Sequence, residues 1–169
     1  SLYEPVAGEK FDLIVSNPPY VMSPPSEDTE RLTYREGQFR ADGLVEAVVR
    51  GAAEHLNPGG TAQFLVNWAI VDGHPWEERL RGWVEGTGLD CLAIERERMD
   101  KYSYIELWLT DAGLAGSDEW RPAYDRWLAY FDELGIEEVG MGWIHLCAAG
   151  REVPVQRFES WPHAVEHPV

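Results

Sequence analysis

Two consecutive prolines, Pro18 and Pro19, directly follow a short apolar run near the start of the chain. Proline has no backbone N–H and a fixed φ, and it pushes the residue before it into an extended conformation. Neither a helix nor a central strand can therefore continue through this point. The preceding run, 11–15, contains β-branched residues and is typical of a buried strand. We expect a strand over 11–15, buried on both faces, that ends at a rigid corner.

The rest of the chain alternates between helical and extended patterns. Apolar residues at three- and four-residue spacing predict helices, and apolar runs bounded by Gly, Pro or Asn predict strands. The expected helices cover 43–55, 75–85 and 120–134, and the expected strands cover 61–67, 89–97 and 139–148. A long polar loop is expected over 23–42, and the residues from 150 onward show little periodicity. This order predicts an α/β doubly wound sheet, in which ligands bind beyond the carboxyl ends of the strands.

One segment, 102–110, fits both a strand and a helix. Alternating apolar residues favour a strand, whereas helical spacing groups Tyr104 with Leu107. Because Asp100 or Ser103 can cap a helix here and Gly113 can end it, we favour the helix.

The charge of the chain limits its partners. Fourteen Lys and Arg residues against 30 Asp and Glu residues give a formal net charge of −16 at pH 7. Such a charge disfavours binding to a bare phosphate backbone, which depends on counterion release by basic side chains. A locally basic groove, a protein substrate and a small-molecule substrate all remain open. With 44% hydrophobic residues the chain is not a disordered acidic tail.

The cysteine content points to a reducing compartment. Cys91 and Cys147 are the two cysteines of the sequence, too few for a disulfide framework or a four-cysteine zinc site. We expect both to be buried thiols, a cytoplasmic location and no metal site. No apolar run approaches the roughly 20 residues that a membrane-spanning helix needs, so we expect no membrane partner.

The corner after the first expected strand carries groups that suit a planar nitrogen. The side chain of Asn17 and the carbonyl of Pro18 are two oxygen acceptors, and Tyr20 adds a flat ring that can stack. Two fixed acceptors beside an aromatic plate match an –NH₂ group. Holding both N–H bonds favours a more tetrahedral nitrogen, whose lone pair can then point at an electrophile placed opposite.

The segment Phe11-Asp-Leu-Ile-Val-Ser-Asn-Pro-Pro-Tyr-Val21 resembles motif IV of class I S-adenosylmethionine-dependent amino-methyltransferases. With Asp42-Gly-Leu and Leu56-Asn-Pro-Gly-Gly60, it is most similar to the HemK-type branch, the protein-glutamine methyltransferases that act on release factors. The similarity is specific over roughly 2–66. It implies a Rossmann-like methyltransferase sheet of which this chain holds the C-terminal half, strands four to seven with flanking helices. That half would occupy 1–149, followed by a C-terminal tail, 150–169.

The resemblance also implies roles for individual residues. Asn17 and the Pro18 carbonyl would bind the target nitrogen, and Tyr20 would pack against the target group as the third catalytic residue. The implied cofactor is S-adenosylmethionine. The remaining implied contacts are Pro19 and Val21 with the substrate, and Ser1, Leu2 and Asn17 with the cofactor.

Trp68, which flanks the loop after the expected strand 61–67, is a further candidate substrate-binding residue. Aromatic residues are more often part of the core, so core packing is the alternative for this side chain.

The family's glycine-rich turn for the methionine part of the cofactor, and its acidic residue for the ribose, have no counterpart before Phe11. We therefore expect the missing N-terminal half to accompany this chain, which would be inactive alone and would present an open apolar edge.

Three functions follow in order of preference. The first is S-adenosylmethionine-dependent methylation of a protein glutamine amide. The second is adenine-N6 methylation of DNA or RNA, which the charge of −16 disfavours. The third is a non-catalytic binding module on a methyltransferase fold.

Overall fold

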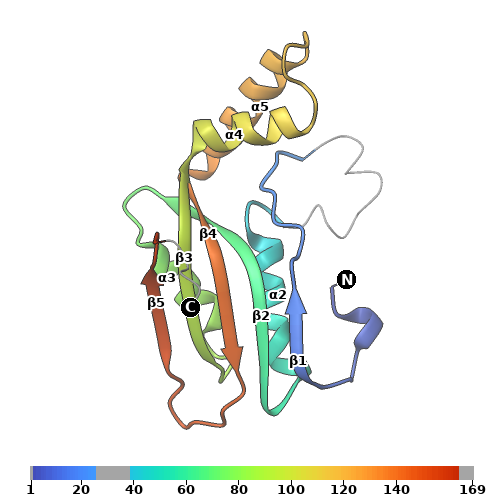
Figure 1. Ribbon diagram of the computed structural model, residues 1–169, viewed down its shortest axis with the longest axis vertical. Coiled ribbons are helices and arrows are strands. Elements are labelled where there is room, and N and C mark those ends of the chain that lie inside the picture. Colours follow the sequence, from blue (N-terminus) through green and yellow to red (C-terminus); the bar gives the residue numbers. More distant parts are fainter. Residues whose placement is uncertain (1, 26–38, 164–169) are drawn as a thin grey trace, which may run out of the picture.

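Five strands form one mixed sheet in the order β1-β2-β4-β3-β5 (Figure 1). The computed structural model describes residues 2–25 and 39–163, so most of the loop expected over 23–42 lies outside the described residues. The strands are β1 (Phe11–Ser16), β2 (Leu56–Val71), β3 (Asp90–Asp100), β4 (Ile136–Cys147) and β5 (Gln156–Ser160). The helices are the 3₁₀ turn η1 (Glu4–Val6) and the α-helices α2 (Gly43–His55), α3 (Trp76–Val84), α4 (Lys101–Asp111) and α5 (Trp120–Leu134).

The fold class expected from the sequence, α/β, is confirmed, but the sheet is not all-parallel. Strand β1 pairs with β2 in parallel, whereas β4 runs antiparallel to both β2 and β3. Each expected helix and strand has a counterpart within a few residues of its expected bounds, except that β2 is longer and begins at Leu56. The Asn-Pro-Gly-Gly segment at 57–60 is thus part of β2 rather than a loop.

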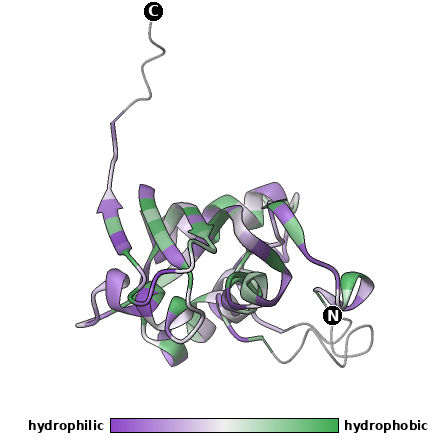
Figure 2. Cartoon of the chain, turned by 90° about the horizontal axis from the view of Figure 1, so that it is seen from below, coloured by the Kyte–Doolittle hydropathy of each residue, from purple (hydrophilic) through white to green (hydrophobic). Residues whose placement is uncertain are grey.

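Helices α2 and α3, which are among the flanking helices expected from the sequence, cover the same face of the sheet. On β2, Phe64, Val66 and Trp68 lie on one face of the strand and pack under both helices in one core cluster. Figure 2, seen along the strands, shows the helices gathered on one side of the sheet. The crossovers β1-α2-β2 and β2-α3-β3 each join parallel strands and move in the same direction across the sheet, so right-handed connections place both helices on one face.

The opposite face of the sheet is open along β1. The side chains of Leu13 and Val15 are 60% and 67% exposed, and Leu65 on the neighbouring strand is 42% exposed. Strand β1 is also the edge of the sheet. Burial of β1 on both faces was therefore a wrong prediction, while the expected open apolar edge is present.

A helical hairpin of α4 and α5 extends beyond the sheet at the top of Figure 1. The ambiguous segment 102–110 is helical, because the Asp100 side chain accepts a hydrogen bond from the Ser103 N–H at 2.9 Å and caps α4. Helix α5 ends at Gly135, whose left-handed φ of 67° suits a residue without Cβ. The two helices share a core of their own that includes Ile105, Leu109, Trp127 and Phe131.

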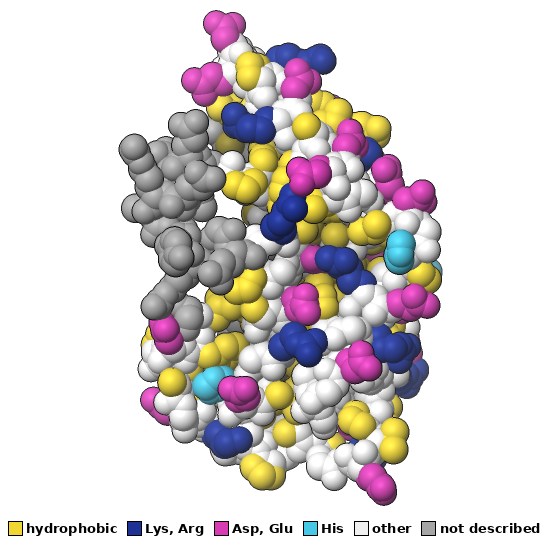
Figure 3. All heavy atoms as spheres, turned by 180° about the vertical axis from the view of Figure 1, so that it is seen from behind, with side chains coloured by type: hydrophobic (Ala, Val, Ile, Leu, Met, Phe, Trp, Pro, Cys, Tyr) yellow, Lys and Arg dark blue, Asp and Glu magenta, His cyan; other side chains and the backbone are white. Residues whose placement is uncertain are grey.

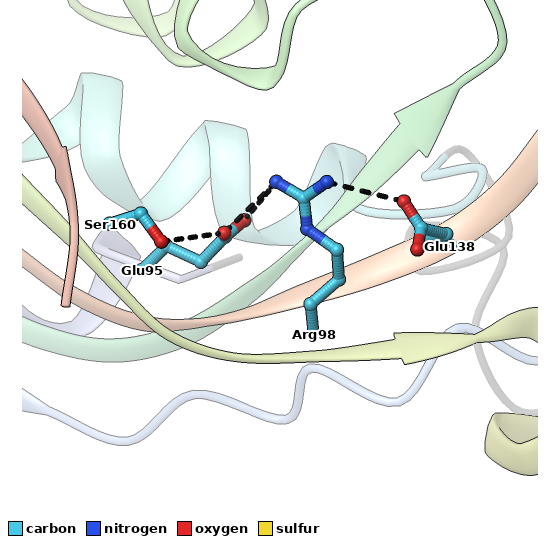
Figure 4. A network of polar contacts seen from close by, with 4 residues as sticks. All are labelled: Glu95, Arg98, Glu138 and Ser160. Carbon is cyan, nitrogen blue, oxygen red and sulfur yellow. Dashed lines mark hydrogen bonds and ion pairs between the residues drawn. The ribbon is translucent and has the colours of Figure 1, made fainter. Parts of the chain in front are cut away.

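The residues from 150 onward contain a strand that periodicity did not reveal. Strand β5 pairs in parallel with β3, and its Ser160 hydroxyl donates to the buried Glu95 carboxylate at 3.2 Å. Arg98 donates to the same carboxylate at 2.9 Å and to Glu138 of β4 at 3.3 Å (Figure 4). Three strands thus meet in one charged network. Within the expected C-terminal tail, 150–169, strand β5 thus belongs to the sheet.

The two cysteines differ in burial. Cys91 is buried in the main core, and desolvation raises the pKa of its thiol to about 12. Cys147 is only half-buried, so the expectation of two buried thiols holds for Cys91 alone. Among the described residues, none of the helices combines the length and apolar character required to cross a bilayer.

We predict that Gly142→Ala destabilises the protein by about 3 kcal/mol, since a Cβ at this position would collide with the Ile94 carbonyl oxygen of the adjacent strand. Gly82→Ala is the control, because a Cβ there meets nothing within 4 Å and alanine favours a helix by up to about 1 kcal/mol. Urea unfolding of both variants measures the difference. Equal stability of the two variants would show that β3 and β4 are less closely paired than described.

We predict that a thiol reagent at pH 8 modifies Cys147 at least about 100-fold faster than Cys91, because burial keeps the Cys91 thiol protonated and inaccessible. Mass spectrometry of the labelled peptides gives both rates. Denaturant should make the two rates equal. Fast labelling of native Cys91 would contradict its place in the core.

Candidate functional site

The proline corner, residues 16–20, leaves the carboxyl end of β1 on the side where the α4–α5 hairpin lies (Figure 1). Pro18 is buried and anchors the corner, whereas the Asn17 side chain is exposed and Tyr20 is half-buried. The rigid backbone of two prolines presents these groups without needing support from a helix or strand. The corner thus occupies the place where ligands bind in α/β sheets.

Both oxygen acceptors of the corner are free. Within residues 2–25 and 39–163, neither the Asn17 side chain nor the Pro18 carbonyl makes a hydrogen bond. A polar group without a protein partner must be accessible to water or to a ligand, because burying it without a hydrogen bond costs about 1–3 kcal/mol. The corner therefore has two acceptors available for an incoming donor.

Cavities lie on both sides of the corner. One of about 480 Å³ is lined by Asn17, Pro18 and Leu2 together with β1. Another of about 270 Å³ is lined by Pro19, Tyr20 and Val21, with further walls from α2 and α5. These two cavities bring together all the residues expected at the site except Ser1, which lies outside the described residues, and Trp68.

Trp68 lies in the core rather than at the site. Its side chain is fully buried under the helices and stacks on Trp76 with ring centroids 5.2 Å apart. The role expected for Trp68 in substrate binding does not fit this position, and the core-packing alternative does. Strand β2 runs to Val71, four residues beyond the expected end at 67, so Trp68 is still part of the strand. Strand alternation then places Trp68 on the same face as Phe64 and Val66.

Tyr104 and Tyr130 of the hairpin hold the chain beside the site, although no sequence pattern pointed to them. The Tyr104 hydroxyl accepts from the Met22 N–H at 3.1 Å, two residues after the corner. The Tyr130 hydroxyl accepts from the Ala41 N–H at 2.8 Å and lines the same cavity as Tyr20. Both residues are more than 80 positions away from their partners, so spacing could not reveal these contacts.

Tyr104 and Asp42 are two buried polar groups whose hydrogen bonds hold neighbouring parts of the chain. Burial raises the pKa of the Tyr104 phenol to about 12, so it is neutral at physiological pH. The Asp42 carboxylate at the start of α2 accepts from Arg79 at 2.5 and 2.7 Å and from the Ala69 N–H at 2.8 Å. This pairing compensates the burial of the charge and fixes the start of α2 against β2.

Comparison with known proteins adds a family resemblance. The chain is 39% identical over 107 residues to the release factor glutamine methyltransferase of Geobacter sulfurreducens. Enzymes of the same name from two strains of Xylella fastidiosa are 35% and 34% identical over 107 residues. The HemK-type resemblance is confirmed. Each match covers 56% of this chain and 34% of the relative, so the chain spans about a third of the length of the curated relatives it matches.

Two further comparisons complete this result. No protein-family model matches the chain. Among solved structures, a protein of Galdieria sulphuraria described as a methyltransferase aligns with 89% of this chain and 58% of its own, at 14% identity and a TM-score of 0.43.

Proposed function

We propose that the full protein to which this chain belongs is an S-adenosylmethionine-dependent N-methyltransferase whose acceptor is a glutamine side chain of another protein. The observation that carries the proposal is the pair of unpaired oxygen acceptors, on Asn17 and Pro18, at a rigid corner between two cavities. The relatives, which are named release factor glutamine methyltransferases, support the choice of a glutamine amide.

The corner would activate the acceptor nitrogen by orientation. The Asn17 side-chain oxygen and the Pro18 carbonyl each accept one N–H of the target –NH₂ group, while the Tyr20 ring packs on its plane. Bound in this way, the nitrogen directs its lone pair away from the two oxygens. The nitrogen would accept the methyl group that the cofactor supplies when bound, and would then lose a proton to water. Because this proton leaves after transfer, no strongly basic side chain is needed at the corner.

The residues present fit one part of the proposed cofactor. S-adenosylmethionine would supply the methyl group from a sulfonium centre. The cavity that Leu2 and Asn17 share is mostly apolar, which suits a flat ring system. Its described lining contains no charged side chain that could hold a ribose or an amino-acid group. We propose that the N-terminal half of the full protein supplies those contacts.

That half would also cover the open face of β1, where Leu13 and Val15 are exposed. Natural sheets protect an apolar edge of this kind, and about two thirds of the length of the relative from Geobacter sulfurreducens lies outside the matched segment. The N-terminal half would thus both complete the cofactor site and bury the exposed apolar side chains of β1.

The charge of the chain supports a protein acceptor over a nucleic acid. On the face shown in Figure 3, Lys and Arg side chains are interspersed with Asp and Glu rather than gathered in a stripe. With a net charge of −16, this surface lacks the basic footprint typical of nucleic-acid enzymes. The two free cysteines are consistent with the reducing cytoplasm, where we place the protein.

We predict that Asn17→Ala abolishes methyl transfer by the full-length protein while the affinity for S-adenosylmethionine changes by less than about 3-fold, because the loss concerns the acceptor nitrogen. The assay offers methyl-labelled cofactor with a release factor, tRNA, rRNA or DNA. Gln63→Ala, which removes an exposed amide elsewhere on the sheet, is the control. Label on glutamine supports the proposal, label on adenine supports the nucleic-acid alternative, and no label from the wild type supports a binding module. Normal turnover of the Asn17 variant would refute its role.

We predict that residues 1–169 expressed alone self-associate through the open face and that the double variant Leu13→Ser, Val15→Ser is monomeric, because it removes the exposed apolar side chains. Light scattering after gel filtration measures the mass. Leu107→Ser, at a leucine of α4 that is 48% exposed, is the control and should leave the association unchanged. A wild-type chain that stays monomeric at high concentration would argue against a missing cover.

A further inference from the structure

The α4–α5 hairpin is not needed to connect the strands on either side of it. Strands β3 and β4 are antiparallel neighbours whose pairing reaches Asp100 and Glu138. A turn of two residues commonly joins such strands. Here residues 101–135 intervene and build two helices with a separate core. The insertion lies at the same end of the sheet as the carboxyl end of β1. Its size indicates a role beyond connecting β3 to β4.

One contact of the hairpin holds the chain just after the proline corner. The Met22 side chain is fully buried in the hairpin core, two residues after Tyr20. Its N–H donates to the Tyr104 hydroxyl at 3.1 Å, and the buried Asn67 side-chain amide donates to the same oxygen at 3.1 Å. Tyr104 thus joins the corner to β2 as well as to α4.

A second contact holds the chain just before α2. The Ala41 N–H donates to the Tyr130 hydroxyl at 2.8 Å, and Arg40 pairs with Glu133 at 2.6 Å. Ala41 has a left-handed φ of 52°, which is uncommon for a residue with a Cβ and must be stabilised by its surroundings. The hairpin therefore binds the chain at Met22, and again at Arg40 and Ala41.

We propose that Tyr104 and Tyr130 are positioning residues of the methyltransferase site, through which the α4–α5 hairpin sets where Tyr20 and the proline corner stand relative to the acceptor. The inference rests on the proposed function. Among the described residues, Asn17 and the Pro18 carbonyl have no partner of their own. The β1–β2 pairing ends at Ser16, at the start of the corner, and the Met22 N–H makes the first hydrogen bond after it. Ala41, which Tyr130 holds, lines the same cavity as Tyr20. A displacement of about 1 Å at reacting groups can lower a rate by about 100-fold, so such support matters for catalysis.

Tyr104→Phe in the full-length protein separates this role from a purely structural one. The variant keeps the ring in the hairpin core but removes the oxygen that receives the Met22 N–H. We expect the Met22 amide to exchange its hydrogen about 10-fold faster, since a typical hydrogen bond contributes about that factor. We expect kcat to fall about 10-fold, while the dissociation constant for S-adenosylmethionine stays within about 2-fold.

Tyr102→Phe is the matched control, because Tyr102 lies on the same helix, is 51% exposed and makes no hydrogen bond through its hydroxyl. It should change neither exchange nor kcat. Tyr130→Phe is a second variant in case Tyr104→Phe fails to fold, and it should accelerate exchange at Ala41 but not at Met22. For either variant, a kcat equal to that of Tyr102→Phe overturns the positioning role, whatever the change in melting temperature.

The two proposals fail in different ways. If the wild type transfers no methyl group to any acceptor, the proposed function fails, and the positioning role for that reaction fails with it. The exchange rates at Met22 and Ala41 still decide whether the hairpin holds the chain. If the wild type is active and the tyrosine variants match the control, the proposed function stands and the positioning role alone is refuted.

Discussion

The antiparallel strand β4, lying between β2 and β3, fixes both the sheet and the surroundings of the proline corner. It pairs with β2 on one side and with β3 on the other. Gly140 allows the close approach of the Trp68 side chain, and Gly142 allows the close approach of the β3 backbone. Because β3 and β4 are neighbours, everything between them must project from one end of the sheet. That end is the one at which β1 delivers Asn17, and so the hairpin comes to lie beside the corner.

Local patterns were enough to predict most elements of this fold. The helix over 43–55, with its spaced valines and a following Pro-Gly-Gly, has nearly the expected bounds, and the Asp100 cap settled the segment 102–110 as helix. What failed was the relation between elements. Whether a strand pairs in parallel or antiparallel depends on partners far along the chain, and β5 has a single aromatic residue, so its pairing with β3 left no periodic signal.

The corner itself was predictable for a different reason. Proline restricts the backbone by its covalent structure, so the geometry at 17–19 is nearly independent of the rest of the fold. The tyrosines that support it depend entirely on tertiary contacts and could not be predicted from spacing. Trp68 shows the converse limit: a large aromatic residue beside an expected site was placed by strand alternation into the core, and only the extent of β2 revealed on which face it lies.

Because the hairpin is inserted between two strands that remain paired, its length and composition can change without shifting the register of the sheet. Such an arrangement separates the register of the sheet, which the hairpin does not set, from the position of the chain beside the proline corner, which Tyr104 and Tyr130 hold. Substitutions within residues 101–135 that keep these two tyrosines are thus a route by which evolution, or a protein engineer, can change the surroundings of the corner while the pairing of β3 with β4 is preserved.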